Sequence, residues 1–529
     1  MKSTTQAILI AYLSLFLLPN TSLSQTFCQQ VIADNGESNN EYIIDITKTS
    51  NQELVFLMQN GYVFDSNMKT MVGRITNDGD SIWLKRYDLV NSSIASRELA
   101  QSIVEAPNKD LIFVSNFSEN NNINMQGFAI ARADSLGTLK GVRQYTDIQL
   151  QATKVFMRPS GDVLVFGVKN SYPFAMLLHP DLDFKQAVNL GFIGYGLGDV
   201  IELPNGDFAG VTRRSGGTAT TTFSVFNLKS NFSAINWISE ITAPQLAFGN
   251  RIAMLSQNKL AITSSLGNDR SILMVMNNSG TLLNVKEFTH QSYQIRTSDV
   301  IPIANGGFIV TGTQGTSSAN MFAIQFNSQG QSVNKFDYGT GSVSKSIKTS
   351  GGLVLAGHID VFLGNVEGKI VKTDSNGNSC CDGTSFVIDI DVPTYPFTLV
   401  NPGLPMSNFQ LTPTVYQTEE YFGCFELTCE DRISSRAESL YHTTVTAPLT
   451  IEEITEFNVY PNPASEKLTI RLSETGGVFR FFNASGQIVK EGLLDSESID
   501  VNISSWKKGV YFLKTEQKNK VITKRIILQ

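Results

Sequence analysis

The residue types best suited to acid–base or metal chemistry are few and scattered in this sequence. The four histidines are His179, His290, His358 and His442, and none has a partner at the spacing of paired metal ligands or of a catalytic dyad. No G-x-S-x-G, H-E-x-x-H or phosphate-loop pattern occurs. From the sequence we therefore assign no catalytic, cofactor-binding or metal-binding residue.

Two acidic groups could do chemistry, and each has a plainer explanation. Residues Asp374–Asn378 place oxygen-bearing side chains at alternating positions, as calcium loops do, which leaves a calcium ion open. However, Ser385 stands where the closing bidentate Glu would be needed, so we favour an Asx-type turn. Asp389 and Asp391 share one strand face and could serve a glycosidase, but alternation of exposed residues explains them equally well.

The cysteines form the third group. Cys380 and Cys381 are adjacent and not spaced C-x-x-C, which argues against a zinc ribbon or a redox motif. In an exported protein, disulfides are favoured over metal binding. We expect a bridge from Cys28 to Cys380 or Cys381 that clasps the two ends of the intervening chain together. The candidate disulfide cysteines are Cys28, Cys380, Cys381, Cys424 and Cys429, an odd number that leaves one over in a monomer.

The N-terminus has the features of a secretory signal peptide. Lys2 supplies a positive charge, and residues 7–18 form an apolar run that is too short to span a membrane. Residues 22–24 offer small side chains at the positions that a signal peptidase reads, so we expect cleavage before Gln25 and a signal peptide over 1–24. No later stretch approaches the length of apolar sequence that a membrane helix needs, so we expect no transmembrane segment.

The composition favours an all-β protein. Of the 529 residues, 41% are hydrophobic and 17% are charged, and the length suits two or three domains. Low charge together with many Ser, Thr, Asn and Gly favours strands over helices. The net charge is −7, and the tail from Ile451 onward carries 11 basic and 10 acidic residues, so the acidity lies in the body. This argues against nucleic acid and anionic lipid surfaces as partners.

A repeated turn motif organises most of the chain. A strand leads into a polar turn with Gly or Asn, and a second strand, often with an aromatic residue, follows, as in residues 75–83. A Gly-containing turn and a short apolar strand precede most copies, as in residues 305–312. Copies at Asp183 and Asn231 are degenerate. The anchors of all copies are positions 79, 137, 183, 231, 280, 330 and 377.

Two hairpins in each period of about fifty residues make a unit of four strands. Such a unit cannot bury both of its faces alone, so its neighbours must stack on it. About seven units close naturally into a β-propeller, which also protects strand edges. We predict a propeller-like repeat domain over residues 25–379 with seven blades, and the degenerate copies leave six or eight open. A β-solenoid is the alternative, but its coils are usually shorter than about fifty residues.

After the repeats, the composition changes twice. Residues 380–429 are rich in Val, Ile, Phe, Tyr and Pro and include the alternating run Phe386–Val392. We predict a cysteine-containing β segment or a small β cap there. Residues 430–456 are polar and mixed, which is typical of a linker between domains.

The C-terminal tail predicts a second β domain. Apolar residues alternate in 468–472, and Phe479 and Phe481 share one face of the next run. Val510 with Phe512 again suit a half-buried strand. About seven short strands in this length make a small β-sandwich the natural fold.

The tail also carries an ordered set of motifs. They open with Y-P-N-P, continue with Gly486 and with G-V-Y, and stop at K-R just before the end of the sequence. The motif residues are Tyr460, Pro461, Asn462, Pro463, Gly486, Gly509, Tyr511, Lys524 and Arg525. This series resembles the type A C-terminal sorting domain of proteins exported by the bacterial type IX secretion system. Bulky Trp506 departs from the small residues that are commoner in that family. We predict a sorting domain over residues 457–529.

The resemblance implies a cellular location and partners. A tail of this kind guides its protein across the outer membrane and is usually removed, often with attachment of the cargo to surface lipopolysaccharide. The type IX secretion machinery and lipopolysaccharide are thus the implied partners, and the cell surface or the medium is the implied location.

Three functions stay open for the repeat domain. We favour a non-enzymatic binding or adhesion protein with the propeller as the platform for a polysaccharide or a protein, because the repeat turns carry mostly Asn, Ser and Gly. The alternative is a secreted hydrolase or lyase that acts on polysaccharide. A charged, concave mouth of the propeller channel would favour this alternative. A purely structural surface repeat protein is a further alternative.

Overall fold

The computed structural model divides the chain into two compact units, residues 1–437 and 438–529, and each is described by itself. Its described part contains forty strands and no helix that is long and apolar enough to span a membrane. The described residues are 26–31, 40–61, 68–90, 96–119, 125–194, 196–213, 221–243, 247–255, 258–267, 269–315, 319–360, 366–381, 388–391, 398–400, 406–411, 413–415, 420–422, 458–460, 464–471, 475–483, 488–496, 498–517 and 520–528. The predicted signal peptide and linker therefore lie outside the described residues.

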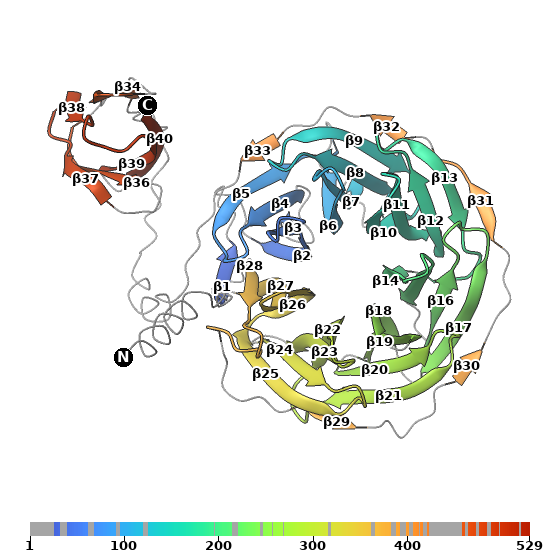
Figure 1. The fold of residues 1–529 in the computed structure, drawn as a ribbon. Coiled ribbons are helices and arrows are strands. Elements are labelled where there is room, and N and C mark those ends of the chain that lie inside the picture. The colour runs from blue at the N-terminus through green and yellow to red at the C-terminus, as the bar shows by residue number, and fades with distance from the viewer. Residues whose placement is uncertain are drawn as a thin grey trace, which may run out of the picture. The chain divides into compact units, whose positions relative to one another are not determined.

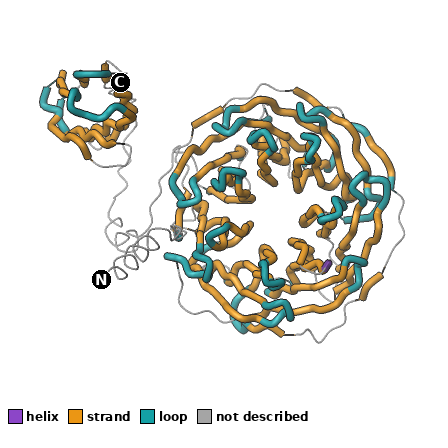
Figure 2. The backbone as a smooth tube through the Cα atoms, viewed as in Figure 1, coloured by secondary structure: helices purple, strands orange, loops and turns teal. Residues whose placement is uncertain are grey.

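Seven groups of four antiparallel strands surround one axis in the first unit (Figures 1 and 2). This confirms the all-β propeller fold and the predicted number of blades. From the innermost strand outward, blades 1 to 3 contain β2 (Glu41–Lys48), β3 (Leu54–Asn60), β4 (Lys69–Ile75) and β5 (Ser81–Tyr87); β6 (Ser96–Glu105), β7 (Leu111–Glu119), β8 (Gly127–Ala133) and β9 (Leu139–Thr146); and β10 (Leu150–Met157), β11 (Val163–Lys169), β12 (Tyr172–Leu178) and β13 (Phe184–Asn189).

The remaining four blades follow the same order. They contain β14 (Gly196–Glu202), β15 (Phe208–Arg213), β16 (Thr221–Leu228) and β17 (Ile235–Ala243); β18 (Ala247–Leu255), β19 (Lys259–Leu266), β20 (Arg270–Asn277) and β21 (Leu282–Thr289); β22 (Ile295–Pro302), β23 (Phe308–Gln314), β24 (Asn320–Phe326) and β25 (Ser332–Thr340); and β26 (Ser342–Thr349), β27 (Gly352–Asp360), β28 (Val366–Lys372) and β1 (Phe27–Val31).

The ring of blades is closed by the N-terminal strand. β1 pairs antiparallel with β28, with Phe27 opposite Lys372, and so becomes the outermost strand of blade 7. Phe27 and Val31 are buried and join a core cluster that contains side chains of blades 1 and 7. The two ends of the repeat region are therefore held in one sheet, which protects the edge that an open ring would expose.

The repeat turns share one hydrogen-bond pattern. In each turn the N–H of the anchor residue donates to the carbonyl three residues earlier, and the anchor has a positive φ, which favours glycine. In blades 3 and 4 the anchors are Leu182 (φ 71°) and Phe232 (φ 59°). The degenerate copies are thus true turns whose centres lie one residue from the predicted Asp183 and Asn231. The glycine anchors are Gly79, Gly137, Gly280, Gly330 and Gly377.

The outermost strand of one blade is hydrogen-bonded to the anchor of the next. The Tyr87 hydroxyl of blade 1 donates to the carbonyl of Gly137 in blade 2 at 2.7 Å. Tyr145 donates to Leu182 at 2.6 Å in the same way. Because both tyrosines are buried, the aromatic residue noticed after the repeat turn acts as a latch between blades. Equivalent latches are Ser239 to Gly280, Tyr338 to Gly377, and Gln29 of β1 to Gly79.

After blade 7, the chain returns around the outside of the propeller (Figure 1). Five three-residue strands extend blades 5, 4, 3, 2 and 1 in that order, and we call them the belt. They are β29 (Asp389–Asp391) on β21, β30 (Thr398–Val400) on β17, β31 (Ser407–Phe409) on β13, β32 (Pro413–Val415) on β9 and β33 (Glu420–Phe422) on β5. Each strand completes a different blade, so the described strands of residues 380–429 form no sheet of their own.

The second unit is a small β-sandwich. Side chains of both sheets, among them Leu468 and Phe481, share one core, which fits the predicted fold. The first sheet contains β34 (Asn458–Tyr460), β35 (Lys467–Arg471) and β38 (Ser498–Asn502), and the second contains β37 (Ile488–Leu493), β36 (Val478–Asn483), β39 (Gly509–Gln517) and β40 (Lys520–Leu528).

The inward face of β39 differs from the prediction. Phe512 is 40% exposed, whereas Tyr511 and Leu513 are buried. Pairing Val510 with Phe512 as the inward face was therefore wrong for Phe512, because this strand is apolar on both faces and alternation alone cannot orient it. Phe479 and Phe481 do share the buried face, with ring centroids 5.9 Å apart. Trp506 packs edge-on against Phe481, with the ring centroids 5.1 Å apart.

Candidate functional site

Polar side chains occupy equivalent positions on the innermost strands of all seven blades. Each of these strands has a register shift at this point, and a β-bulge re-aims the side chain next to it. The residues that follow the shifts are Asp45, Ser102, Lys154, Asp199, Arg251, Asp299 and Lys345. We call them the axial ring. Most of them border a hollow of about 180 Å³, the axial hollow, together with Arg213 of β15.

Sequence reasoning missed the axial ring because its residue types differ from blade to blade. The signal that could have found it is position. Where the following turn is among the described residues, the ring residue lies four residues before its start, as Asp45 does before Thr49 and Asp299 before Ile303. Aligning the blades on these turns places an acid, a base or a serine at every equivalent position.

Two aspartates of the ring connect neighbouring blades. One Asp45 carboxylate oxygen accepts hydrogen bonds from the Ser102 hydroxyl and the Ile103 amide of blade 2, each at 3.0 Å. Asp299 of blade 6 accepts a bond from the Ser346 amide of blade 7 at 3.0 Å. These carboxylates satisfy buried polar groups of the innermost strands β6 and β26, which pair with a neighbouring strand on one edge only.

The basic ring residues are also engaged. Lys345 and Asp299 form an ion pair at 2.8 Å. Burial would raise the pKa of Asp299, but Lys345 and Arg251 lower it below its ordinary value. Burial would lower the pKa of Lys345, but Asp299 and Asp199 raise it. Both groups therefore stay charged at neutral pH, so neither is poised for proton transfer.

Arg251 and Lys154 complete the ring. Arg251 donates to the carbonyl of Gly198 at 3.3 Å and to that of Ser344 at 3.1 Å, so it bridges blades 4 and 7 across the axis. Its Nε is buried without a hydrogen-bond partner among the described residues. The Lys154 ammonium group lies 4.0 Å from a carboxylate oxygen of Asp199.

A second and larger hollow lies between blades 6 and 7. It measures about 420 Å³ and is bordered by strands of blade 6 and by two turns of blade 7. Phe336 and Tyr338 form its aromatic wall, with nearly parallel rings 6.2 Å apart. Gln325, Asn305 and Asn376 supply amide groups to its lining. We call it the blade 6–7 pocket.

Blade 6 differs from blades 1 and 2 at one position that borders this pocket. Two residues before the turn, blades 1 and 2 carry Arg74 and Arg132. These guanidinium groups reach the turn of the next blade and donate to the carbonyls of Ser135 and Pro180. Blade 6 has the shorter Gln325 at that position, and its amide oxygen accepts a bond from the outer strand of its own blade. The space that arginine fills after blades 1 and 2 is thus left free after blade 6.

The acidic candidates from the sequence occupy separate places. Asp374 accepts N–H bonds from Asn376 at 2.9 Å and from Asn378 at 2.8 Å, which confirms the Asx-type turn. Asp389 and Asp391 are both exposed on β29. Among the described residues, no three His, Cys, Asp or Glu side chains gather as a metal site would require.

The histidines are equally dispersed. His358 packs edge-on against Tyr42, with the ring centroids 4.9 Å apart. Burial lowers the pKa of His358, although Asp360 raises it. His290 accepts amide bonds from its own turn, and His179 begins the turn of blade 3. His442 lies outside the described residues.

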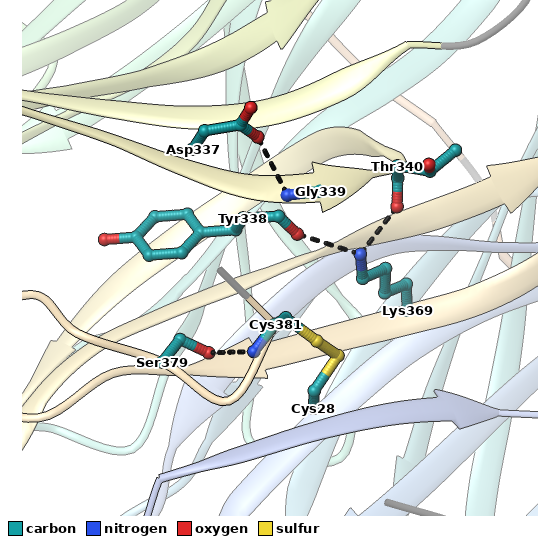
Figure 3. Close-up of a disulfide and its surroundings, with 8 residues drawn as sticks. All are labelled: Cys28, Asp337, Tyr338, Gly339, Thr340, Lys369, Ser379 and Cys381. Atoms are coloured by element: carbon teal, nitrogen blue, oxygen red, sulfur yellow. Dashed lines mark hydrogen bonds between the residues drawn. A yellow bond between two sulfur atoms is a disulfide. The ribbon is translucent and has the colours of Figure 1, made fainter. Parts of the chain in front are cut away.

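A disulfide joins β1 to the start of the belt (Figure 3). Cys28 is bonded to Cys381, with the Cα atoms 5.8 Å apart and a sequence separation of 353. Cys380 is exposed, and the other two candidates, Cys424 and Cys429, lie outside the described residues. Of the two partners expected for Cys28, the structure has Cys381.

Beside the disulfide, Lys369 fixes the end of β25 (Figure 3). Its ammonium group donates to the carbonyls of Tyr338 at 3.1 Å and Thr340 at 2.6 Å. Burial lowers the pKa of Lys369 to about 8 although Asp337 raises it. The lysine thereby satisfies two carbonyls at a strand end.

The motif residues of the tail fall into three groups. Tyr511 is buried, and its hydroxyl donates to the Lys507 carbonyl at 2.8 Å. Tyr460 is 46% exposed, and Gly509 has a φ of 150° at the start of β39. Lys524 is half-buried. Arg525 lies on β40, and the residues outside the described part are Pro461, Asn462, Pro463 and Gly486.

The sequence of this unit matches a known family over residues 458–529, that of the secretion system C-terminal sorting domain. The tail is a type IX sorting domain. The match confirms the resemblance noted from the motifs. A sorting domain directs its protein across the outer membrane, so the protein is exported to the cell surface or secreted.

Comparison with known proteins gives a short sequence match and weak structural similarities. Beta-agarase A of Zobellia galactanivorans is 39% identical over 70 residues, which cover 12% of this chain and 13% of the agarase. PorZ, a bacterial surface component of the type IX secretion system of Porphyromonas gingivalis, is 10% identical with a TM-score of 0.38, over 93% of this chain and 60% of PorZ. The polysaccharide lyase Uly1 is 10% identical with a TM-score of 0.39, over 66% of this chain and 100% of the lyase. Similarity this low assigns neither function to this protein.

Proposed function

We propose that this exported protein is a non-enzymatic binding protein whose propeller takes a saccharide unit of a polysaccharide in the blade 6–7 pocket. The observation that carries the proposal is the composition of this pocket. It combines an aromatic wall with amide and hydroxyl groups in a volume of about 420 Å³, within the range usual for small-molecule sites.

The aromatic wall suits the apolar side of a sugar ring. Phe336 packs closely over the anchor of the blade 7 turn, since a Cβ on Gly377 would lie 2.5 Å from its ring. The Tyr338 hydroxyl is held by the carbonyl of the same glycine at 2.9 Å. Both rings are thus fixed before a ligand arrives, which reduces the entropy cost of binding.

The polar lining suits sugar hydroxyl groups. The Gln325 oxygen is engaged with Asn334 at 3.0 Å, which leaves its NH₂ group to act as a donor. The turn of blade 7 adds Ser375 and Asn376, both exposed. Such neutral donors and acceptors pair with hydroxyl groups, and the charged residues Lys348 and Asp374 also border the pocket.

Filling the pocket tests this proposal. Gln325→Arg introduces the side chain that closes the equivalent space after blades 1 and 2, and we expect at least a tenfold loss of affinity with an unchanged or raised Tm. Gln186→Arg, on an exposed face of blade 3, is the control of equal charge. A glycan array identifies the ligand, and titration of the mature protein measures the affinity. Equal affinity in both variants, or no glycan bound by the folded wild type, contradicts the proposal.

An enzyme acting on polysaccharide is the second candidate, favoured by the charged axial hollow. The pairing of Asp299 with Lys345 speaks against it, because a general acid needs a raised pKa and that of Asp299 is lowered. Incubation of a bound polysaccharide with the protein decides between the two. New reducing ends or unsaturated products that disappear in Asp199→Asn would favour the enzyme.

A further inference from the structure

We infer that the axial hollow binds one anionic group, a carboxylate or a sulfate, between Arg213 and Arg251. The inference concerns a different place from the blade 6–7 pocket and does not depend on the saccharide proposal. It rests on the charge balance of the hollow, on the bonds of its charged groups and on its size.

The positive charges in and around the hollow outnumber the negative ones. Four cationic side chains border it, namely those of Lys154, Arg213, Arg251 and Lys345, and the acids on its border are Asp45 and Asp199. Asp299 of the axial ring adds one more negative charge. One cationic group therefore has no counter-charge among these residues.

The cation that forms no ion pair is Arg213, on which Asp199 acts only at a distance. Asp299 is paired with Lys345 at 2.8 Å, Asp199 lies nearest Lys154 at 4.0 Å, and Asp45 is held by the amide and hydroxyl of the next blade. In the described part of the chain, the Arg213 side chain makes no hydrogen bond or ion pair, and it borders the hollow. Desolvation by the surrounding protein and the neighbouring positive Arg251 lower the pKa of Arg213 to about 10, so it stays charged at neutral pH.

The second arginine offers a donor to the same space. Three carbonyls, those of Gly198, Asn250 and Ser344, accept bonds from the Arg251 guanidinium, while its buried Nε–H has no partner among the described residues. Two neighbouring guanidinium groups repel each other, and an anion between them removes that repulsion and takes up free N–H donors at once. Arginine recognises carboxylates and sulfates through paired N–H···O bonds of this kind.

The size of the hollow limits the ligand. About 180 Å³ holds a few water molecules or an anionic group with part of the molecule that carries it, and not a folded chain. The anion could be a free inorganic ion or the acidic group of a sugar. The two sources share the same recognition chemistry and are separated by the choice of probes.

Binding of sulfate, glucuronate and glucose to the mature full chain, measured by calorimetry at constant ionic strength, tests the inference. We expect sulfate and glucuronate to bind to the wild type and glucose not to bind in this hollow. Arg213→Gln should weaken anion binding at least tenfold, and Arg213→Lys, which keeps the charge, should retain part of it. The control Lys229→Gln, an exposed turn residue of blade 4, should stay within twofold of the wild type.

The outcomes separate cleanly. Binding of glucuronate without sulfate identifies an acidic sugar as the ligand, and binding of both identifies a general anion site. The inference is overturned if the wild type binds neither anion, if Arg213→Gln binds them as tightly as the control, or if Arg213→Gln lowers the affinity for glucose as much as that for glucuronate. Loss of saccharide binding in the blade 6–7 pocket would leave these results unaffected, so the two proposals fail independently.

Discussion

Removing the disulfide between Cys28 and Cys381 should lower the melting temperature by about 3–8 °C. The bond closes a loop of 353 residues, and the chain-entropy relation gives about 6 kcal/mol of stabilisation for a loop of this length. Measured disulfide effects are usually smaller, about 2–4 kcal/mol, because the unfolded state keeps some structure and because part of the contribution is not entropic. The range of about 2–6 kcal/mol is therefore the expectation for the free energy of unfolding.

The melting temperature follows from the size of the propeller. An unfolding entropy of roughly 2.1 cal/mol/K per residue amounts to about 0.7 kcal/mol/K for roughly 350 residues. Dividing the stabilisation by this entropy gives the shift of about 3–8 °C. The five-residue pairing of β1 with β28 remains in the variant, so the ring should still close.

The double variant Cys28→Ser/Cys381→Ser is the perturbation, and Cys380→Ser is the matched control because it changes the adjacent, exposed cysteine. Calorimetry of the oxidised proteins gives the melting temperatures, and non-reducing peptide mapping of the wild type gives the pairing. A double variant that melts within about 1 °C of the control, while the wild type contains the bond, would refute the loop-closure reasoning. A Cys28 peptide linked to any other cysteine would refute the pairing itself.

Three further predictions concern single positions in the propeller. Tyr87→Phe removes the latch to the Gly137 carbonyl and should cost about 1–2 kcal/mol in the free energy of unfolding; Tyr172→Phe is the control, and equal unfolding in urea would contradict the latch. Burial raises the pKa of Glu98 to about 7, so the folded state binds a proton more readily than the unfolded chain does, and stability should fall by up to about 3 kcal/mol as the pH rises from about 4.5 to 7. A melting profile over this range that is the same for Glu98→Gln and the wild type would count against it. Gln149 is exposed with a φ of 53°, so Gln149→Gly should relieve backbone strain and raise stability by about 0.5–1 kcal/mol, which a lowered melting temperature would disprove.

The blades were predictable because their signals are local. A polar turn with a positive φ at its centre sits between two apolar runs, and all of its hydrogen bonds lie within five residues, as at Asp374. Leu182 and Phe232 show the limit of that signal. Their turns keep the same hydrogen bonds without glycine. Both side chains are buried, so tertiary packing stabilises a positive φ that a leucine or a phenylalanine does not predict.

The belt and the ring closure could not be predicted because their partners are distant in sequence. β33 pairs with β5, and β1 pairs with β28. A three-residue strand has too short a pattern to specify its register by alternation, so only the unpaired edge that it meets decides its place. The axial ring is different, since its constant distance from the turns is present in the sequence, and only its varying residue types conceal it.

The disulfide and the blade 6–7 pocket belong to one packed cluster. Cys28 and Cys381 pack in the same core as Phe336 and Tyr338, and a Cβ on Gly339 would lie 3.3 Å from the Cys381 carbonyl. The strand that carries the aromatic wall therefore rests directly on the segment that the disulfide fixes.

Through this contact, the export of the protein affects its proposed binding site. Disulfides form outside the reducing cytoplasm, and the sorting domain belongs to a chain that leaves it. Lys369 already holds the carbonyls on both sides of Gly339, so the bond to Cys381 adds a covalent support to a wall that hydrogen bonds have positioned. Export thus brings the chain to the oxidising surroundings in which the support behind this wall is completed.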